Sequence, residues 1–187
     1  MEVNLANNVQ TDSIVDGEGL RIVVWFQGCS HKCLGCHNPS THEFNKGIKT
    51  TVDKVSEEIF SVENHDGITL TGGDPLFQIE AALSLVKQLK KHKKNIWCYT
   101  GFTFEEILLM SKSNPSYLEF LKNIDVLVDG RFILEQRSLS LKFRGSKNQR
   151  ILNVKRSLKE NRACSIRKYK SSNNQKSLKP SKSYLFV

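Results

Sequence analysis

The sequence lacks any long hydrophobic run, and its polar N-terminus lacks the apolar core of a signal peptide. No apolar stretch approaches the roughly 20 residues that a membrane-spanning helix needs. We therefore expect a cytoplasmic protein with no membrane partner. Its 39% of hydrophobic and 25% of charged residues are ordinary for a globular chain.

Cysteines are too few and too unevenly spaced for a secreted disulfide framework. The chain has five, an odd number, and Cys29, Cys33 and Cys36 are crowded together. Secreted disulfide scaffolds carry an even number of cysteines, which this chain does not have. The crowding of three cysteines predicts metal-bound thiolates instead. Cys98 lies in an apolar run and is expected to be buried, whereas Cys164 is expected to be an incidental thiol.

Acidic residues are nearly absent from the C-terminal segment. Residues 155–187 hold ten of the 28 basic residues and one of the 19 acidic ones, so the whole formal charge of +9 belongs to them. Their Ser, Asn and Lys content offers little apolar burial to offset chain entropy. We expect one catalytic domain over 1–154 and a basic, disordered tail over 155–187, either solvated or in contact with RNA or an acidic partner.

Apolar runs alternate with helical patterns along the first 154 residues. This order predicts an α/β fold with a mostly parallel sheet and helices outside it. There are too few units for an eight-stranded barrel, so we expect an open, partial one. The predicted strands are residues 20–28, 67–71, 95–101, 124–130 and 149–154, and the predicted helices are residues 52–62, 79–89, 102–110 and 116–123, the last two split at Pro115.

Motifs that suit a binding site follow the first four predicted strands. The cysteine loop follows the first strand, TGGDP the second, YTGF the third and VDGRF the fourth. Parallel sheets bind ligands at the carboxyl ends of their strands, where these loops gather. We expect the four loops to converge on one edge of the sheet.

The three crowded cysteines have the spacing C-x3-C-x2-C. Three thiolates on one short loop can ligate three corners of a cuboidal 4Fe–4S cluster. The fourth iron then lacks a protein ligand and can bind a substrate directly, as open catalytic metal sites do. A Cys3His zinc site is the alternative, although the paired C-x2-C knuckles of zinc ribbons are absent. Its fourth ligand would be His31, His37 or His42.

This cysteine motif after one strand, with Gly72-Gly73-Asp74-Pro75 after the next, resembles the radical S-adenosylmethionine superfamily. GGDP alone is also a good turn sequence. The resemblance implies an open partial (β/α) barrel of the radical SAM type, one 4Fe–4S cluster on the three cysteines and S-adenosyl-L-methionine on the open iron. It also implies that Gly72 and Gly73 bind the methionine side of the cofactor, with Asp74 as a nearby anion.

Five segments resemble, more narrowly, the activating proteins of the anaerobic (class III) ribonucleotide reductase. They are GCSHKCLGCHNPST, ITLTGGDPL, IWCYTGF, IDVLVDGRF and FRGSKNQRI. Gly35 fits this family, whereas many members of the superfamily have an aromatic residue there. The resemblance implies that Gly35, Cys36 and His37 line the adenine side of the cofactor.

Other residues on these motifs have open roles. Asp129, Arg144 and Asn148 suit structural contacts as well as contacts to the cofactor or a partner. The family has no counterpart that we know for the chain beyond residue 155, so the role of that segment is open too.

The resemblance implies a function: the chain generates a glycyl radical on the large subunit of the anaerobic ribonucleotide reductase under anaerobic conditions. It implies a low-potential electron donor such as flavodoxin and is compatible with a homodimer. We expect no nucleic-acid partner except through the basic tail. One alternative is an activase of another glycyl-radical enzyme, such as pyruvate formate-lyase. Another, from a different class, is a zinc- or RNA-binding module.

Overall fold

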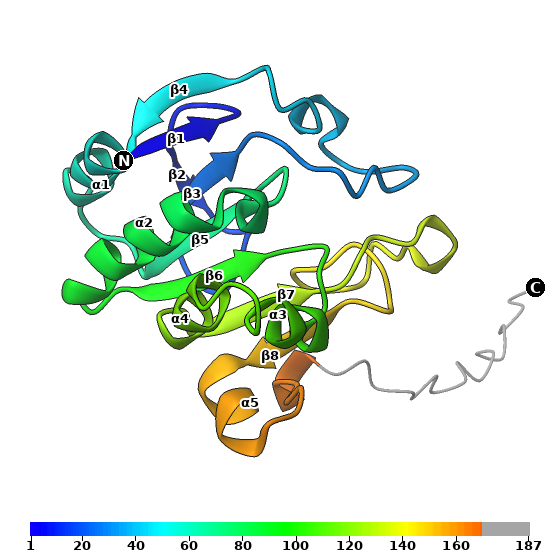
Figure 1. The fold of residues 1–187 in the computed structure, drawn as a ribbon. Coiled ribbons are helices and arrows are strands. Elements are labelled where there is room, and N and C mark those ends of the chain that lie inside the picture. The colour runs from blue at the N-terminus through cyan, green and yellow to red at the C-terminus, as the bar shows by residue number, and fades with distance from the viewer. Residues whose placement is uncertain (170–187) are drawn as a thin grey trace, which may run out of the picture.

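The computed structural model describes residues 1–169 and builds them around one mixed β-sheet (Figure 1). Across these residues the strand order is β4-β1-β3-β5-β6-β7-β8, and β2 pairs with β3 off this path. The strands are β1 (Glu2–Leu5), β2 (Gln10–Ser13), β3 (Arg21–Phe26), β4 (Ile48–Thr51), β5 (Gly67–Gly72), β6 (Asn95–Tyr99), β7 (Val126–Asp129) and β8 (Arg150–Asn153).

The centre of the sheet is parallel and its flanks are antiparallel. β3, β5, β6 and β7 run parallel to one another, whereas β1, β4 and β8 pair antiparallel with their neighbours. β4 and β8 lie at opposite ends of the strand order, so the sheet is open within the described residues and is not a closed barrel. The expected α/β class is confirmed in this mixed form.

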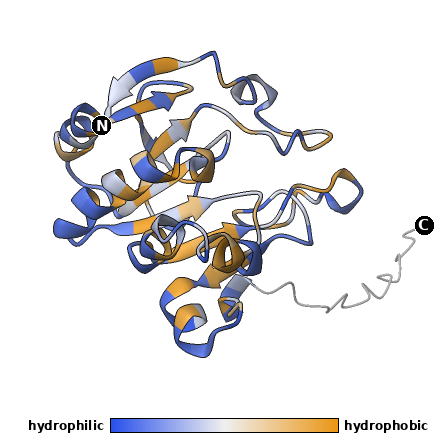
Figure 2. Cartoon of the chain, viewed as in Figure 1, coloured by the Kyte–Doolittle hydropathy of each residue, from blue (hydrophilic) through white to orange (hydrophobic). Residues whose placement is uncertain are grey.

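β3, at the centre of the sheet, forms where the sequence is continuously apolar. Ile22, Val23, Val24 and Phe26 of β3 are fully buried. Successive side chains of a strand point to opposite faces, so a strand buried along its length is covered on both faces. Figure 2 shows hydrophobic residues along the strands and hydrophilic ones on the outer turns of the helices.

Five α-helices of the described region form a layer beside the sheet (Figure 1). α2 packs against α1 and α4, and α4 packs against α3 and α5. Pro115 is the N-cap of α4 and separates it from α3, as predicted. Among residues 1–169, no helix has both the length and the apolar character needed to span a bilayer. The helices are α1 (Val52–Phe60), α2 (Ile79–Lys91), α3 (Phe104–Met110), α4 (Ser116–Lys122) and α5 (Val154–Glu160).

Three strands near the N-terminus were not predicted from the sequence. β1, β2 and β4 are each four residues long, and QTDS and IKTT carry no apolar alternation. β4 pairs with β1 along its whole length, from Glu2 opposite Thr51 to Leu5 opposite Ile48. This long-range pairing, rather than local propensity, places both strands in the sheet.

The expectation of a disordered tail from residue 155 is wrong for residues 155–169. α5 occupies Val154–Glu160, and the segment after it covers the outer edge of β8. Two hydrogen bonds hold that segment, from Asn153 N to the Cys164 carbonyl (2.9 Å) and from Ile166 N to the Ile151 carbonyl (2.8 Å). Cys164 is therefore a buried residue, 4% exposed, and not an incidental thiol. Residues 170–187 lie outside the described part, and the division into two regions stays a prediction.

We expect a chain that ends at Val154 to be much less stable than one that ends at Tyr169. The shorter chain loses α5 and the apolar contacts of Leu158, Cys164 and Ile166. Burial of one such side chain is worth about 1.5–3 kcal/mol, so we expect a loss of at least about 3 kcal/mol in the free energy of unfolding. Urea unfolding of the two chains measures it, and equal midpoints would contradict the packing of this segment.

Candidate iron–sulfur site at the strand ends

The cysteine loop follows β3 and leads through the short 3-10 helix η1 (Pro39–Thr41) to β4. Cys29 is buried at 7% exposure, Cys33 and Cys36 are partly exposed, and all three are free thiols. Cys36 N donates to the Cys33 carbonyl (3.1 Å), and Asn38 N donates to the Cys36 sulfur (3.4 Å). The three predicted ligands thus share one tight loop at the carboxyl end of β3.

The glycine pair at the end of β5 packs against the base of this loop. Gly73 N donates to the Phe26 carbonyl (2.7 Å), and Asp74 N donates to the Gly28 carbonyl (3.0 Å). A Cβ on Gly73 would lie 2.5 Å from the Gly28 oxygen, and Gly72 has a φ of +106°, which L side chains rarely adopt. The close approach of β5 to the cysteine loop therefore requires both glycines.

The segment that follows β7 also lies against the cysteine loop; both extend to the right in Figure 1. A Cβ on Gly35 would lie 2.9 Å from Leu134 Cδ1. The rings of His37 and Phe132 are 6.0 Å apart. Residues that the resemblance assigned to the adenine side thus face a segment that comes from the far end of the parallel sheet.

His31, midway between Cys29 and Cys33, completes the meeting of the loops. Its ring packs against Phe77 and Phe102, with centroids 5.3 and 4.5 Å away, and its Nε2 lies 3.0 Å from Asp74 Oδ2. A Cβ on Gly101, just after β6, would collide with the imidazole. The predicted convergence of the loops after β3, β5, β6 and β7 is confirmed, whereas the pairing of His31 with Asp74 was not predicted.

The three thiols suit a 4Fe–4S cluster, because each thiolate would ligate a different iron and three on one loop can cover three corners. Within residues 1–169, no three or more His, Cys, Asp or Glu side chains are gathered so as to hold a single metal ion. Burial raises the pKa of the Cys29 thiol to about 11. Ligation requires the thiolate, so binding of a cluster would release a proton from Cys29.

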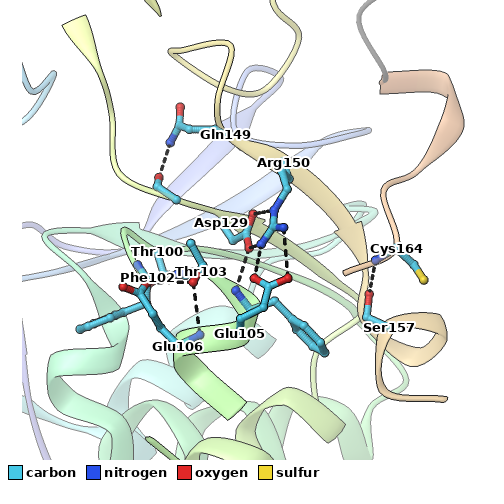
Figure 3. A network of polar contacts seen from close by, with 12 residues as sticks. Thr100, Phe102, Thr103, Glu105, Glu106, Asp129, Gln149, Arg150, Ser157 and Cys164 are labelled. Atoms are coloured by element: carbon cyan, nitrogen blue, oxygen red, sulfur yellow. Dashed lines mark hydrogen bonds and ion pairs between the residues drawn. The ribbon is translucent and has the colours of Figure 1, made fainter. Parts of the chain in front are cut away.

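A second polar cluster lies beside this edge, at the ends of β6 and β7 (Figure 3). The buried carboxylate of Asp129 accepts hydrogen bonds from Arg150 Nε (2.9 Å) and Nη2 (2.5 Å), and Arg150 also donates to Glu105 (2.6 Å). Its hydrogen bonds with Asp129 raise the pKa of Arg150 above the ordinary value. The cluster borders a hollow of about 380 Å³ that reaches Gly101, and through Gly101 it adjoins the cysteine loop.

The residues whose roles were open have contacts within the fold. Asp129 pairs with Arg150, as described above. Arg144 donates to the carbonyls of Gln149 (3.1 Å) and Tyr169 (2.9 Å). Asn148 Nδ2 donates to the Arg131 carbonyl (2.8 Å). These contacts hold the segment between β7 and β8, and they reach into the C-terminal segment that covers β8.

Comparison with known proteins first shows the class of iron–sulfur protein to which the chain belongs. The family model of a 4Fe–4S single cluster domain matches residues 15–152, which include the cysteine loop and all four central strands. Within that class, the chain is similar to curated relatives named anaerobic ribonucleoside-triphosphate reductase-activating protein. The protein of Haemophilus influenzae is 37% identical over 73% of this chain and 89% of its own length. That of Enterobacteria phage T4 is 39% identical over 73% and 86%, and that of Escherichia coli K12 is 35% identical over 73% and 90%.

The chain therefore belongs to the family of anaerobic ribonucleoside-triphosphate reductase-activating proteins, within the 4Fe–4S single-cluster class. This confirms the resemblance drawn from the motifs. The matched region ends near β8, so the family membership rests on the part of the chain that carries the cysteine loop, the glycine pair and the strand ends around them.

Proposed function

We propose that this chain is a radical S-adenosylmethionine activase that generates a glycyl radical on the large subunit of the anaerobic ribonucleotide reductase. The observation that carries the proposal is the position of the three free thiols, on one loop at the strand ends, in a chain of this family. A bound cluster would deliver one electron to the sulfonium of S-adenosylmethionine, which gives methionine and the 5′-deoxyadenosyl radical that takes hydrogen from a glycine Cα.

Gly35 supports this reading over an activase of another glycyl-radical enzyme. Its φ is +73°, and the Leu134 side chain lies where a Cβ would project. An aromatic residue, as many members of the superfamily have before the third cysteine, would need both a strained backbone and displacement of Leu134. The segment after β7 is thus fitted to a glycine at this position.

The roles we propose for the site follow the resemblance. Cys29, Cys33 and Cys36 ligate the cluster. Gly35, Cys36 and His37 line the adenine side of S-adenosylmethionine, and the Gly72-Gly73 pair lines its methionine side. No protein nucleophile or general base is required, because the chain's part is to bind, orient and shield the cofactor.

The wider setting is proposed on the same grounds. The open sheet would correspond to a partial (β/α) barrel of the radical SAM type, whose open edge admits a protein loop as substrate. A low-potential donor such as flavodoxin would reduce the cluster in the cytoplasm under anaerobic conditions. The chain would act as a homodimer or in complex with the reductase.

Electron paramagnetic resonance tests the function directly. The protein is reconstituted with iron and sulfide, then mixed anaerobically with reductant, S-adenosylmethionine and the large reductase subunit from the same source. We expect a glycyl-radical doublet on the reductase. If 5′-deoxyadenosine forms without a doublet, the reductase is not the partner. The result would then favour an activase of another glycyl-radical enzyme. A loaded, reducible cluster that gives neither product would overturn the radical mechanism.

A further inference from the structure

Asp74 is a fully buried carboxylate that accepts hydrogen bonds from four donors of the protein. Its Oδ2 accepts from His31 Nε2 (3.0 Å), Thr100 Oγ1 (2.8 Å) and Gly101 N (2.9 Å), and its Oδ1 accepts from Leu76 N (2.9 Å). A carboxylate oxygen offers about two acceptor positions, so the three donors on Oδ2 fill that oxygen, whereas Oδ1 has one donor. Asp74 is thus held in place by donors of the protein itself, and its role as an anion near the cofactor, which the resemblance implies, stays a prediction.

The donors of Asp74 come from three separate segments at the strand ends. His31 belongs to the cysteine loop after β3, Thr100 and Gly101 follow β6, and Leu76 belongs to the short 3-10 helix η2 (Pro75–Gln78). Asp74 itself follows β5. One buried side chain thus joins the cysteine loop to the loops of the next two parallel strands.

His31 is the only side chain of the cysteine loop that reaches Asp74 in a hydrogen bond among the described residues. Its own side chain is 5% exposed, and of the ion pairs formed by residues 1–169 Asp74 takes part only in this one. The imidazole is wedged between Phe77 and Phe102. Loss of His31 would remove one hydrogen-bond donor from the buried carboxylate of Asp74. It would also remove the hydrogen bond that ties the cysteine loop to Asp74.

A histidine that merely fills the core would not need this arrangement. His31 lies two residues from Cys29 and two from Cys33, and the backbone at Lys32 has a positive φ of 48°. An anchor at the middle of the C-x3-C segment restrains the backbone on both sides of it. The anchor is therefore placed where it controls the separation of the first two thiols.

We propose that His31 and Asp74 are a pair of positioning residues that holds the cysteine loop in the conformation that accepts the cluster. The inference rests on the proposed function, since it assumes that these cysteines are the ligands. Both residues act through the backbone of the cysteine loop. Their effect is on how readily the loop takes up and keeps iron and sulfide.

Two variants separate the hydrogen bond from the packing. Asp74→Asn keeps the shape but removes the charge and turns one acceptor into a donor that faces existing donors. His31→Phe keeps an aromatic ring between Phe77 and Phe102 but removes the Nε2 donor. The matched control is Asp129→Asn, which changes a second fully buried carboxylate. Its partners belong to other elements, Arg150 to β8 and Phe104 to α3.

The first readout needs no cluster. Trypsin can cut the apoprotein after Lys32, which is exposed, once the loop opens. A hydrogen bond to a charged group is worth about 1.5–3 kcal/mol, so we expect cleavage there to be at least about tenfold faster in Asp74→Asn and His31→Phe than in wild type. Asp129→Asn is expected to lower the melting temperature without accelerating this cleavage.

The second readout is iron and sulfide bound after anaerobic reconstitution, together with the electron paramagnetic resonance signal of the reduced cluster. We expect both His31 and Asp74 variants to bind less and to give an altered signal, and the double variant to be no worse than either single one. Wild-type values in both variants, or equal losses in Asp129→Asn, would overturn the positioning role. If the wild type itself binds no cluster, the proposed function fails, and trypsin cleavage alone decides whether the pair anchors the loop.

Discussion

Replacement of Cys33 by alanine is expected to abolish cluster binding and, with it, cleavage of S-adenosylmethionine. Cys33 is at the centre of the C-x3-C-x2-C segment, and its carbonyl accepts the hydrogen bond that closes the turn to Cys36. With two thiolates left on the loop, a second iron of the cluster loses its protein ligand. Iron and sulfide analysis should give about four of each per wild-type chain and at least tenfold less in the variant.

The chain offers matched controls for this experiment. Cys98 and Cys164 are also free thiols but are buried, in β6 and in the segment after α5. Cys98→Ala and Cys164→Ala remove a small buried side chain, cost about 1 kcal/mol of stability and should leave iron content unchanged. Iron loading that survives in Cys33→Ala would refute the ligand assignment. About one zinc per wild-type chain without labile sulfide would favour the zinc alternative.

The parallel core was predictable because its residues carry local signals. β3 carries the continuous apolar run IVVWF, and β5 alternates Ile68 and Leu70 with threonines. Most residues of both strands are buried, and each strand leads into a motif of the site. Once the alternation of strands and helices fixes a parallel sheet, the loops after those strands must share an edge. The convergence of the cysteine loop and TGGDP follows from this topology.

The flanking elements were not predictable in the same way. β4 is held by β1, which lies more than forty residues earlier in the chain, and IKTT has no pattern of its own. α5 and the segment after it lie in a stretch rich in Lys and Ser, yet Leu158 of α5 and Cys164 and Ile166 of that segment supply apolar contacts with the rest of the fold. The prediction of disorder used the average composition of the 33 residues 155–187, in which these three apolar residues have little weight.

Within the candidate site, the sequence predicted roles for the thiols and the glycines, but not the contacts between the loops. His31 and Asp74 are 43 positions apart in the sequence, and neither residue type alone predicts which side chain it will contact. The one available signal was that an aspartate directly after a buried strand must find donors. Which donors it finds depends on how the loops after β3 and β6 fold over it.

Gly73→Ala is expected to displace the cysteine loop. The new Cβ would lie 2.5 Å from the Gly28 carbonyl oxygen and 2.8 Å from that of Thr41, which are backbone atoms that no side-chain rotation can move. Relief requires β5 to separate from the base of the loop, which breaks the hydrogen bond from Gly73 N to the Phe26 carbonyl (2.7 Å). We expect a loss of about 2–4 kcal/mol in the free energy of unfolding.

The same substitution should also reduce cluster loading, because the Gly28 backbone that it displaces leads directly into Cys29. Gly145→Ala is the control, since its nearest neighbour is the Phe132 side chain at 3.0 Å, which can move aside. Urea unfolding and iron analysis of both variants then separate two effects. If Gly73→Ala lost stability but bound iron normally, the glycine would serve only the packing of β5. Combined loss of stability and iron, with Gly145→Ala near wild type, would show that the approach of β5 sets the position of the ligand loop.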